Sequence, residues 1–446
     1  MLDEFVSAFD RMKREIFCSL LEDVFTADNI PEELWKRACL NIGDGGLGYR
    51  SVHDVSFSAY AASLVECSRS LDKTLPDFVQ RLENIHTLQQ PSDLNVLRDF
   101  QDCIQFIGDH NSGVQVSVQW ICGLRGKDRA TAVAVDDFVV DKTLQALIGK
   151  QVRLNRAEEY LKYLIQKNDN DGIAWFKSVS GTYPGRWLQH VPKSNSTRLS
   201  PNEFTVMLFY RLHLPLPAIV PGSRCTGKGC GLVDLYGIHL STGCGKGGYR
   251  HRTHDNLVLS VESMTRSCGI LSRREARRCF QADASESQRR PDLLLYNAPK
   301  HDKPVVVDLM ITGPVSTKAL SRSAALQQFR AAESAYQRKQ ASYREIAPGN
   351  NFDFEAIIFE STGNIHPKTV EFFNSVLEKS ASGDKSRLCA LKRFWYGVLS
   401  FSLQKFLAQS ILSRIADMNC REIFNYNLAQ AYIERAAMES EHLHRE

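Results

Sequence analysis

The sequence lacks long apolar segments, although it has 446 residues. Its uninterrupted apolar stretches, such as Leu293–Tyr296 and Val305–Val307, are far shorter than the ~18–20 residues that a membrane-spanning helix needs. The first 14 residues carry six charged side chains, so no secretory signal peptide is expected there. No repeat with a period of roughly 20–50 residues stands out. The chain is therefore expected to form two or three ordinary folded domains without membrane association.

The sequence also lacks an excess of charge of either sign. Lys and Arg total 55 against 51 Asp and Glu, a net charge of +4, and 43% of the residues are hydrophobic. These values exclude an acidic disordered tail and a highly basic nucleic-acid-binding arm. Charge is nevertheless uneven: residues 1–100 hold 10 basic and 17 acidic side chains, and residues 221–300 hold 13 basic and 7 acidic ones. An acidic first part is thus joined to a basic segment.

Most of the 12 cysteines show no grouping, and without a secretory signal a disulfide framework is not expected. Nine are scattered and are interpreted as small buried apolar residues. The other three lie within 20 residues and share that segment with a histidine, in the pattern Cys225-x4-Cys230-x8-His239-x4-Cys244. Two close pairs of soft ligands are typical of a structural zinc site, which fills all four positions. The alternative is three ordinary buried thiols beside a surface histidine.

Apolar periodicity predicts an α+β protein, with a mostly helical N-terminal half followed by a small zinc knuckle and an α/β core. Predicted strands are residues 292–297, 305–311 and 353–360. Predicted helices in the second half are residues 203–217, 256–280, 319–346 and most of 367–440. The domains expected from this pattern are a helical domain at 1–165, a linker at 166–220, the knuckle at 221–250, the α/β core at 251–380 and C-terminal helices at 381–446.

Two aspartates stand out in the predicted strands, because a carboxylate in an apolar strand is costly unless it is paired or binds a metal. If residues 298–304 form the loop of an antiparallel hairpin, Asp292 lies opposite Met310, and Asp308 is its diagonal neighbour at roughly 7 Å. Two carboxylates at that separation can share Mg²⁺ or Mn²⁺. The alternatives are a turn residue after Pro291 for Asp292, and an ion pair with an arginine for Asp308.

A lysine on the following predicted helix completes this group. Lys339 and Tyr343 are four residues apart and therefore share one helix face. A lysine near two metal-binding carboxylates can orient or activate the water that attacks a phosphodiester. A solvated lysine on an amphipathic helix is the alternative interpretation.

The order of these features resembles the C-terminal region of one class of non-LTR retrotransposon polyproteins. In that family a segment after the reverse transcriptase precedes a CCHC zinc knuckle and a restriction-like endonuclease of the PD-(D/E)xK superfamily. The similar segments are Gly45–Ser51, Trp187–Leu188, Arg211–Pro215, the knuckle with Asp234 and Gly237, Arg252–Val258, Arg290–Asp292, Asp308, Lys339 with Tyr343, and Phe352–Phe373.

This resemblance implies a metal-dependent endonuclease that nicks DNA at an insertion target. Asp292 and Asp308 would bind magnesium, Lys339 would be the catalytic lysine with Tyr343 nearby, and Glu262 would be the early acidic residue. DNA would be the main partner, with the element's RNA as a second, and a DNA substrate implies a nuclear location. The residues expected to contact nucleic acid are His254, Arg273, Arg274, Arg277, Arg278, Arg289 and Arg290.

Two departures from the family pattern leave other functions open. The superfamily lysine usually lies two residues after the second acid, where this chain has Met310. The chain also has no Tyr-x-Asp-Asp motif, so no polymerase site is expected. The alternative functions are a catalytically inactive, zinc-containing nucleic-acid-binding remnant of a retroelement and a cellular repair nuclease of the same superfamily.

Overall fold

The computed structural model describes residues 2–72, 144–315 and 325–418, together with residues 99 and 103. Short gaps within these ranges fall at 23, 193–196, 226, 228–229, 246–247, 276–279 and 281–289. Two compact units are present. One comprises Met1–Phe17 and Thr26–Tyr163, and the other comprises Cys18–Phe25 and Leu164–Glu446. The finer five-part division of the chain stays a prediction.

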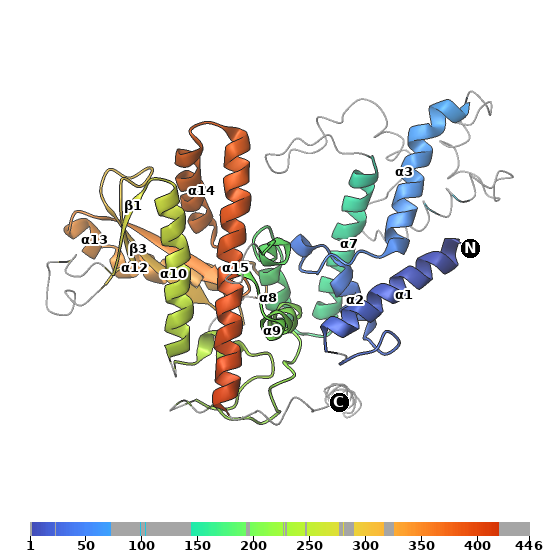
Figure 1. The fold of residues 1–446 in the computed structure, drawn as a ribbon, viewed down its shortest axis with the longest axis horizontal. Helices are drawn as coiled ribbons and strands as arrows, with labels where there is room; N and C mark the ends of the chain where they lie inside the picture. Colours follow the sequence, from blue (N-terminus) through green and yellow to red (C-terminus); the bar gives the residue numbers. More distant parts are fainter. Residues whose placement is uncertain are drawn as a thin grey trace. The chain divides into compact units, whose positions relative to one another are not determined.

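The first unit is helical where it is described (Figure 1). Its core includes an aromatic group in which the rings of Phe17, Trp35 and Tyr49 lie 5.4–6.0 Å apart. The elements are α1 (Leu2–Leu20), α2 (Glu32–Cys39), a 3-10 turn (Ile42–Asp44), α3 (Val52–Asp72) and α7 (Leu144–Gln166). The last three residues of α1 and of α7 belong to the second unit.

The second unit combines helices with a single described sheet, so the chain is a mixed α+β protein that is mostly helical, as predicted. Strong local signals begin its helices: Ser200 and Glu203 form a capping box at α9, and the Asp384 side chain accepts two backbone N–H groups at α15. The helices are α8 (Asn170–Val179), α9 (Pro201–Leu212), α10 (Tyr249–Ser267), α12 (Arg330–Tyr343), α13 (Ile346–Gly349), α14 (Pro367–Ala381) and α15 (Lys385–Asp417). No described helix is long and apolar enough to cross a membrane.

The sheet has four strands in the order β1-β2-β3-β4. The first two pairings are antiparallel and the third is parallel, because α12 and α13 form the crossover between β3 and β4. The strands are β1 (Leu271–Arg274), β2 (Leu293–Tyr296), β3 (Val305–Thr312) and β4 (Asp353–Glu360).

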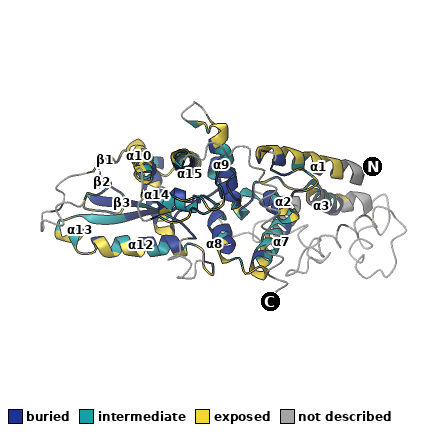
Figure 2. Ribbon diagram, turned by 90° about the horizontal axis from the view of Figure 1, so that it is seen from below, coloured by how far each residue is buried: buried dark blue, intermediate teal, exposed yellow. Residues whose placement is uncertain are grey.

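Helices cover both faces of this sheet. Ala332 and Ala335 of α12 pack on Ala356 and Ile358 of β4, while α10 and α14 cover the opposite face and α15 packs on these two helices (Figure 2). Val305–Val307 is fully buried between these layers. This burial explains why β3 reads as an uninterrupted apolar run before Asp308.

Three details differ from the sequence prediction. The helix predicted at 256–280 is α10, which ends at Ser267 because Gly269 adopts a left-handed conformation (φ 75°), so Arg273 and Arg274 lie on β1. Of the helix predicted at 319–346, residues 319–324 lie outside the described residues, residues 325–329 form turns, and α12 begins at Arg330, after Phe329 at φ 63°. The hairpin register is also shifted by two residues, since Leu293 pairs with Val307.

Candidate metal centre and acidic site

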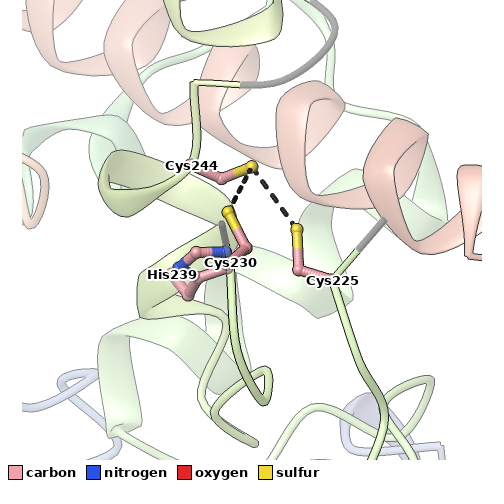
Figure 3. A group of neighbouring side chains, drawn as sticks. All are labelled: Cys225, Cys230, His239 and Cys244. Atoms are coloured by element: carbon pink, nitrogen blue, oxygen red, sulfur yellow. Dashed lines mark hydrogen bonds between the residues drawn. The ribbon is translucent and has the colours of Figure 1, made fainter. Parts of the chain in front are cut away.

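Cys225, Cys230, His239 and Cys244 converge in the second unit as their spacing predicts. Their ligand atoms all lie within 4.8 Å of one another. The Cys244 Sγ atom is 3.5 Å from that of Cys225 and 3.9 Å from that of Cys230, and Figure 3 shows the three sulfur atoms turned toward a common centre. The four side chains can therefore hold a metal ion such as zinc.

The loop before His239 is held by Asp234. Its carboxylate accepts the backbone N–H groups of Tyr236, Ile238 and His239 at 2.6–3.0 Å. Gly237 makes the turn possible because its φ is 75° and an added Cβ would lie 2.6 Å from a methyl carbon of Leu216. A short π-helix (His239–Gly243) then brings Cys244 back to the centre.

Three observations at this centre fit a bound metal ion. The Nε2 atom of His239 is buried without a hydrogen-bond partner. A Cβ at Gly227 would lie 3.0–3.4 Å from all three sulfur atoms, so the backbone closes tightly around them. Burial lowers the pKa of His239, with the charge of Arg414 acting in the same direction, which favours the neutral imidazole that metals bind.

The thiols themselves require a cation in order to ionise together. Desolvation and the neighbouring sulfur atoms of Cys225 and Cys244 raise the pKa of Cys230 to about 11. Three adjacent thiolates repel one another, whereas a divalent cation compensates their charge.

Asp292 and Asp308 form a second group, the acidic site. Continuing the observed register places Asp292 directly opposite Asp308 instead of opposite Met310, and the two side chains interact. The predicted proximity is correct although the assumed register was wrong, because a shift of two residues keeps every side chain on its face of the sheet.

The Asp292 carboxylate extends the β2–β3 ladder at the start of β2, which begins at Leu293. Its Oδ2 atom accepts the backbone N–H of Leu309 at 2.6 Å and lies 3.2 Å from Nε2 of His254. The same Nε2 is 3.1 Å from the Leu309 carbonyl oxygen. His254, predicted to contact nucleic acid, therefore lies against Asp292.

These contacts set the charges of the pair. Burial opposes charge on both His254 and Asp292, but their mutual hydrogen bond and attraction raise the pKa of His254 to about 9 and lower that of Asp292. Burial raises the pKa of Asp308, and the charge of Asp292 adds to this effect.

Lys339 reaches the acidic site from α12, as predicted. Its Nζ atom donates to Asp308 Oδ2 at 2.7 Å, and both side chains are largely buried. The lysine partly offsets the rise in the pKa of Asp308. His254, Asp292, Asp308 and Lys339 thus form one continuous chain, in which two neighbouring carboxylates lie between two basic side chains.

Two other residues predicted for this site lie elsewhere. Glu262 is buried on α10, where Arg266 and Arg274 each lie 2.9 Å from its carboxylate. Tyr343 is buried in the apolar core, with its ring stacked 4.3 Å from that of Phe354. The structure brings neither the Glu262 carboxylate nor the Tyr343 ring to the two aspartates.

The predicted nucleic-acid contacts are only partly described. Arg273, Arg274 and Arg290 are exposed, and Arg274 is paired with Glu262. Arg277, Arg278 and Arg289 lie outside the described residues.

The sequence did not predict Arg414, a buried cation beside the cysteines. The sequence feature that could have identified it is the position of an arginine on the apolar helix face defined by Leu407 and Ile411.

Comparison with protein-family models and with curated proteins finds no match to this chain. Conclusions about function therefore depend on the geometry of the two sites.

The ion pair between His254 and Asp292 predicts a pH-dependent stability. The pKa of His254 in the folded chain, about 9, exceeds its ordinary value of 6.5, so the stabilisation is complete at about pH 6 and is lost as the pH rises through 9. The loss is at most about 3 kcal/mol. We expect the difference in unfolding free energy between wild type and His254→Gln to shrink by up to that amount from about pH 6 to pH 10. Urea titrations of both proteins measure it, and a difference that stays constant with pH would contradict the ion pair.

Proposed function

We propose that this chain is a metal-dependent DNA endonuclease with a restriction-like core, similar to the nuclease of non-LTR retrotransposons. The observation that carries the proposal is the approach of Asp292, Asp308 and Lys339 to one another, with Lys339 Nζ 2.7 Å from Asp308 Oδ2. Asp292 directly precedes β2, Asp308 lies in β3, and Lys339 lies on α12, 31 residues after Asp308.

The two aspartates suit a hard divalent cation. Mg²⁺ takes oxygen ligands and is commonly bound by one or two carboxylates, with water and substrate phosphate completing the shell. A bound Mg²⁺ or Mn²⁺ supplies Lewis acidity toward an oxygen of the scissile phosphate. Asp292 is held in place for this role by the Leu309 N–H and by His254.

Lys339 has two functions in this proposal. In the absence of a cation its ammonium group pairs with Asp308 and compensates the buried carboxylate. With substrate present, the same group stabilises charge that develops on the transferred phosphate or orients the attacking water.

Zinc is the metal that we assign to Cys225, Cys230, His239 and Cys244, because three thiolates and one imidazole in a closed set are typical of structural zinc. Exposed arginines near the acidic site, Arg273 and Arg290, are assigned to the DNA backbone. Such contacts give affinity that falls steeply with salt.

A second candidate is a nucleic-acid-binding protein without turnover. The observation in its favour is that protein groups already hold both carboxylates, since Lys339 binds Asp308 while His254 and Leu309 bind Asp292. An ion-pair network of this kind is stable without any cation.

A plasmid-nicking assay separates the two functions. We expect the zinc-loaded wild type to convert supercoiled plasmid to open circles with Mg²⁺ or Mn²⁺ and to leave it intact without them. Salt-sensitive binding without nicking would instead identify the non-enzymatic protein.

Lys339→Met is expected to lower the nicking rate by about 10²-fold, the lower range for loss of an acid–base group. Lys339→Arg retains the charge but not the compact ammonium group, so it should recover only part of the rate. Lys368→Met, a change of an exposed lysine on α14, is the control and should nick at the wild-type rate. Rates are measured in single-turnover reactions, and an unchanged rate for Lys339→Met would remove this lysine from the mechanism.

A further inference from the structure

Arg414 is an unusual cation within α15. Its side chain is 5% exposed, and its Nη2 atom donates to the carbonyl oxygen of Cys244 at 2.8 Å. The Nε and Nη1 atoms are buried and have no hydrogen-bond partner. A buried guanidinium with unpaired donors is costly, so its surroundings are expected to provide compensating negative charge.

Among the described residues, no acidic side chain forms an ion pair with Arg414. The aromatic ring of Tyr249 lies 5.5 Å from its guanidinium carbon, a cation–π contact. Asp417, one turn further along α15, accepts instead the hydroxyl proton of Tyr249 at 3.0 Å. Two of the cysteines, Cys225 and Cys244, also lie beside Arg414.

Arg414, Cys225 and Cys244 line one small cavity of about 10 Å³, together with Tyr249 and the Asp417 to which it is bonded. A cavity of this volume holds at most one water molecule, so a phosphate or another polyatomic anion does not fit. The negative partner of Arg414 must therefore belong to the protein itself.

The charge of the metal centre supplies the missing partner. Three thiolates, one neutral imidazole and one divalent cation carry a net charge of −1, which the single charge of Arg414 neutralises. We propose that Arg414 is the counter-ion of the metal–thiolate centre, with its unpaired N–H groups directed to the cysteine sulfurs once they are ionised. This assignment rests on the proposed zinc centre and adds to it a positioning residue from the C-terminal helix.

The assignment also accounts for the position of Arg414 in the sequence. It lies on the apolar face of α15, beside buried Ile411 and Ile415, where a cation without a partner would destabilise the helix packing. Because 170 residues separate Arg414 from Cys244, the helix is fastened to the centre by this contact.

The test compares the zinc affinity of wild type with those of Arg414→Lys and Arg414→Gln, by competition with a chromophoric chelator. Lysine retains the charge, whereas glutamine retains only a hydrogen-bond donor. We expect the lysine variant to bind zinc within about threefold of wild type and the glutamine variant to bind at least about tenfold more weakly. Arg393→Gln, a change of an exposed arginine on the same helix, should not differ from wild type.

Substitution with Co²⁺ gives a second readout that does not depend on affinity. Charge-transfer absorption from thiolate to cobalt should move to lower energy in Arg414→Gln and stay near the wild-type position in Arg414→Lys. Equal affinities and spectra in all three proteins would overturn the counter-ion role. If Arg414→Gln does not fold, a tenfold loss of zinc affinity in Arg414→Lys would likewise overturn the counter-ion role. Wild type that binds no zinc contradicts the metal centre itself, which is a separate outcome.

Discussion

Asp308→Asn is expected to reduce metal-dependent nicking of plasmid DNA by at least about 10³-fold, equivalent to about 4 kcal/mol of transition-state stabilisation. The amide removes one anionic ligand of the proposed magnesium site and the ion-pair partner of Lys339. Because the substitution is nearly isosteric, and the pKa of Asp308 is already raised by burial, a neutral group should be tolerated there. The fold should therefore persist while turnover is lost.

The control for this variant is Glu355→Gln. Glu355 is also a largely buried carboxylate in the sheet, but it lies on β4 and binds His301. Burial raises its pKa too, so its neutralisation should disturb the protein to a similar degree without affecting the acidic site. We expect near wild-type nicking by Glu355→Gln. Loss of nicking in both variants would show that activity follows general stability, and retention in Asp308→Asn would exclude this carboxylate.

Two further variants test the positions that the sequence assigned to the site. Glu262→Gln should retain nicking if Arg266 and Arg274 are its only functional partners. Tyr343→Phe keeps the ring stacked on Phe354 and should also retain nicking.

Removal of zinc is expected to have the largest effect on stability, a loss of more than about 5 kcal/mol in the unfolding free energy of the second unit. The centre is joined to the sheet through buried hydrogen bonds. The hydroxyl of Tyr210 bonds to Ser241 of the π-helix at 2.9 Å and to Ser361, just after β4, at 2.8 Å. Loss of the metal therefore releases a loop that is bonded to the core.

Cys244→Ser should reproduce this effect, because the protein then lacks the central thiolate of the set. Cys268→Ser is the matched control, since Cys268 is also buried but lies outside the cluster. Thermal unfolding with and without a strong chelator measures both variants. We expect the chelator to lower the melting temperature of wild type and Cys268→Ser and to leave Cys244→Ser unchanged. Equal sensitivity of all three proteins would contradict zinc binding by these cysteines.

Local sequence patterns predicted much of the second unit. The strand at 353–360 has the predicted bounds, and the strand at 305–311 is one residue longer in the structure. Such strands can be predicted from the sequence because apolar runs of about four to eight residues are characteristic of buried strands. The end of α10 was harder to predict, since Gly269 and the pairing of β1 with β2 outweigh the helical periodicity around them.

The cluster of Cys225, Cys230, His239 and Cys244 was predicted from the sequence alone, because soft ligands within 20 residues need only short, glycine-rich loops to meet. The geometry of the acidic site could not be predicted from local sequence patterns alone. Asp292 and Asp308 meet through the register of a hairpin, and Lys339 meets Asp308 through a crossover helix. Only the tertiary structure placed His254 against Asp292 and Arg414 against Cys244, across 38 and 170 residues. Contacts over such distances follow from how helices pack on the sheet, and no local spacing encodes that packing.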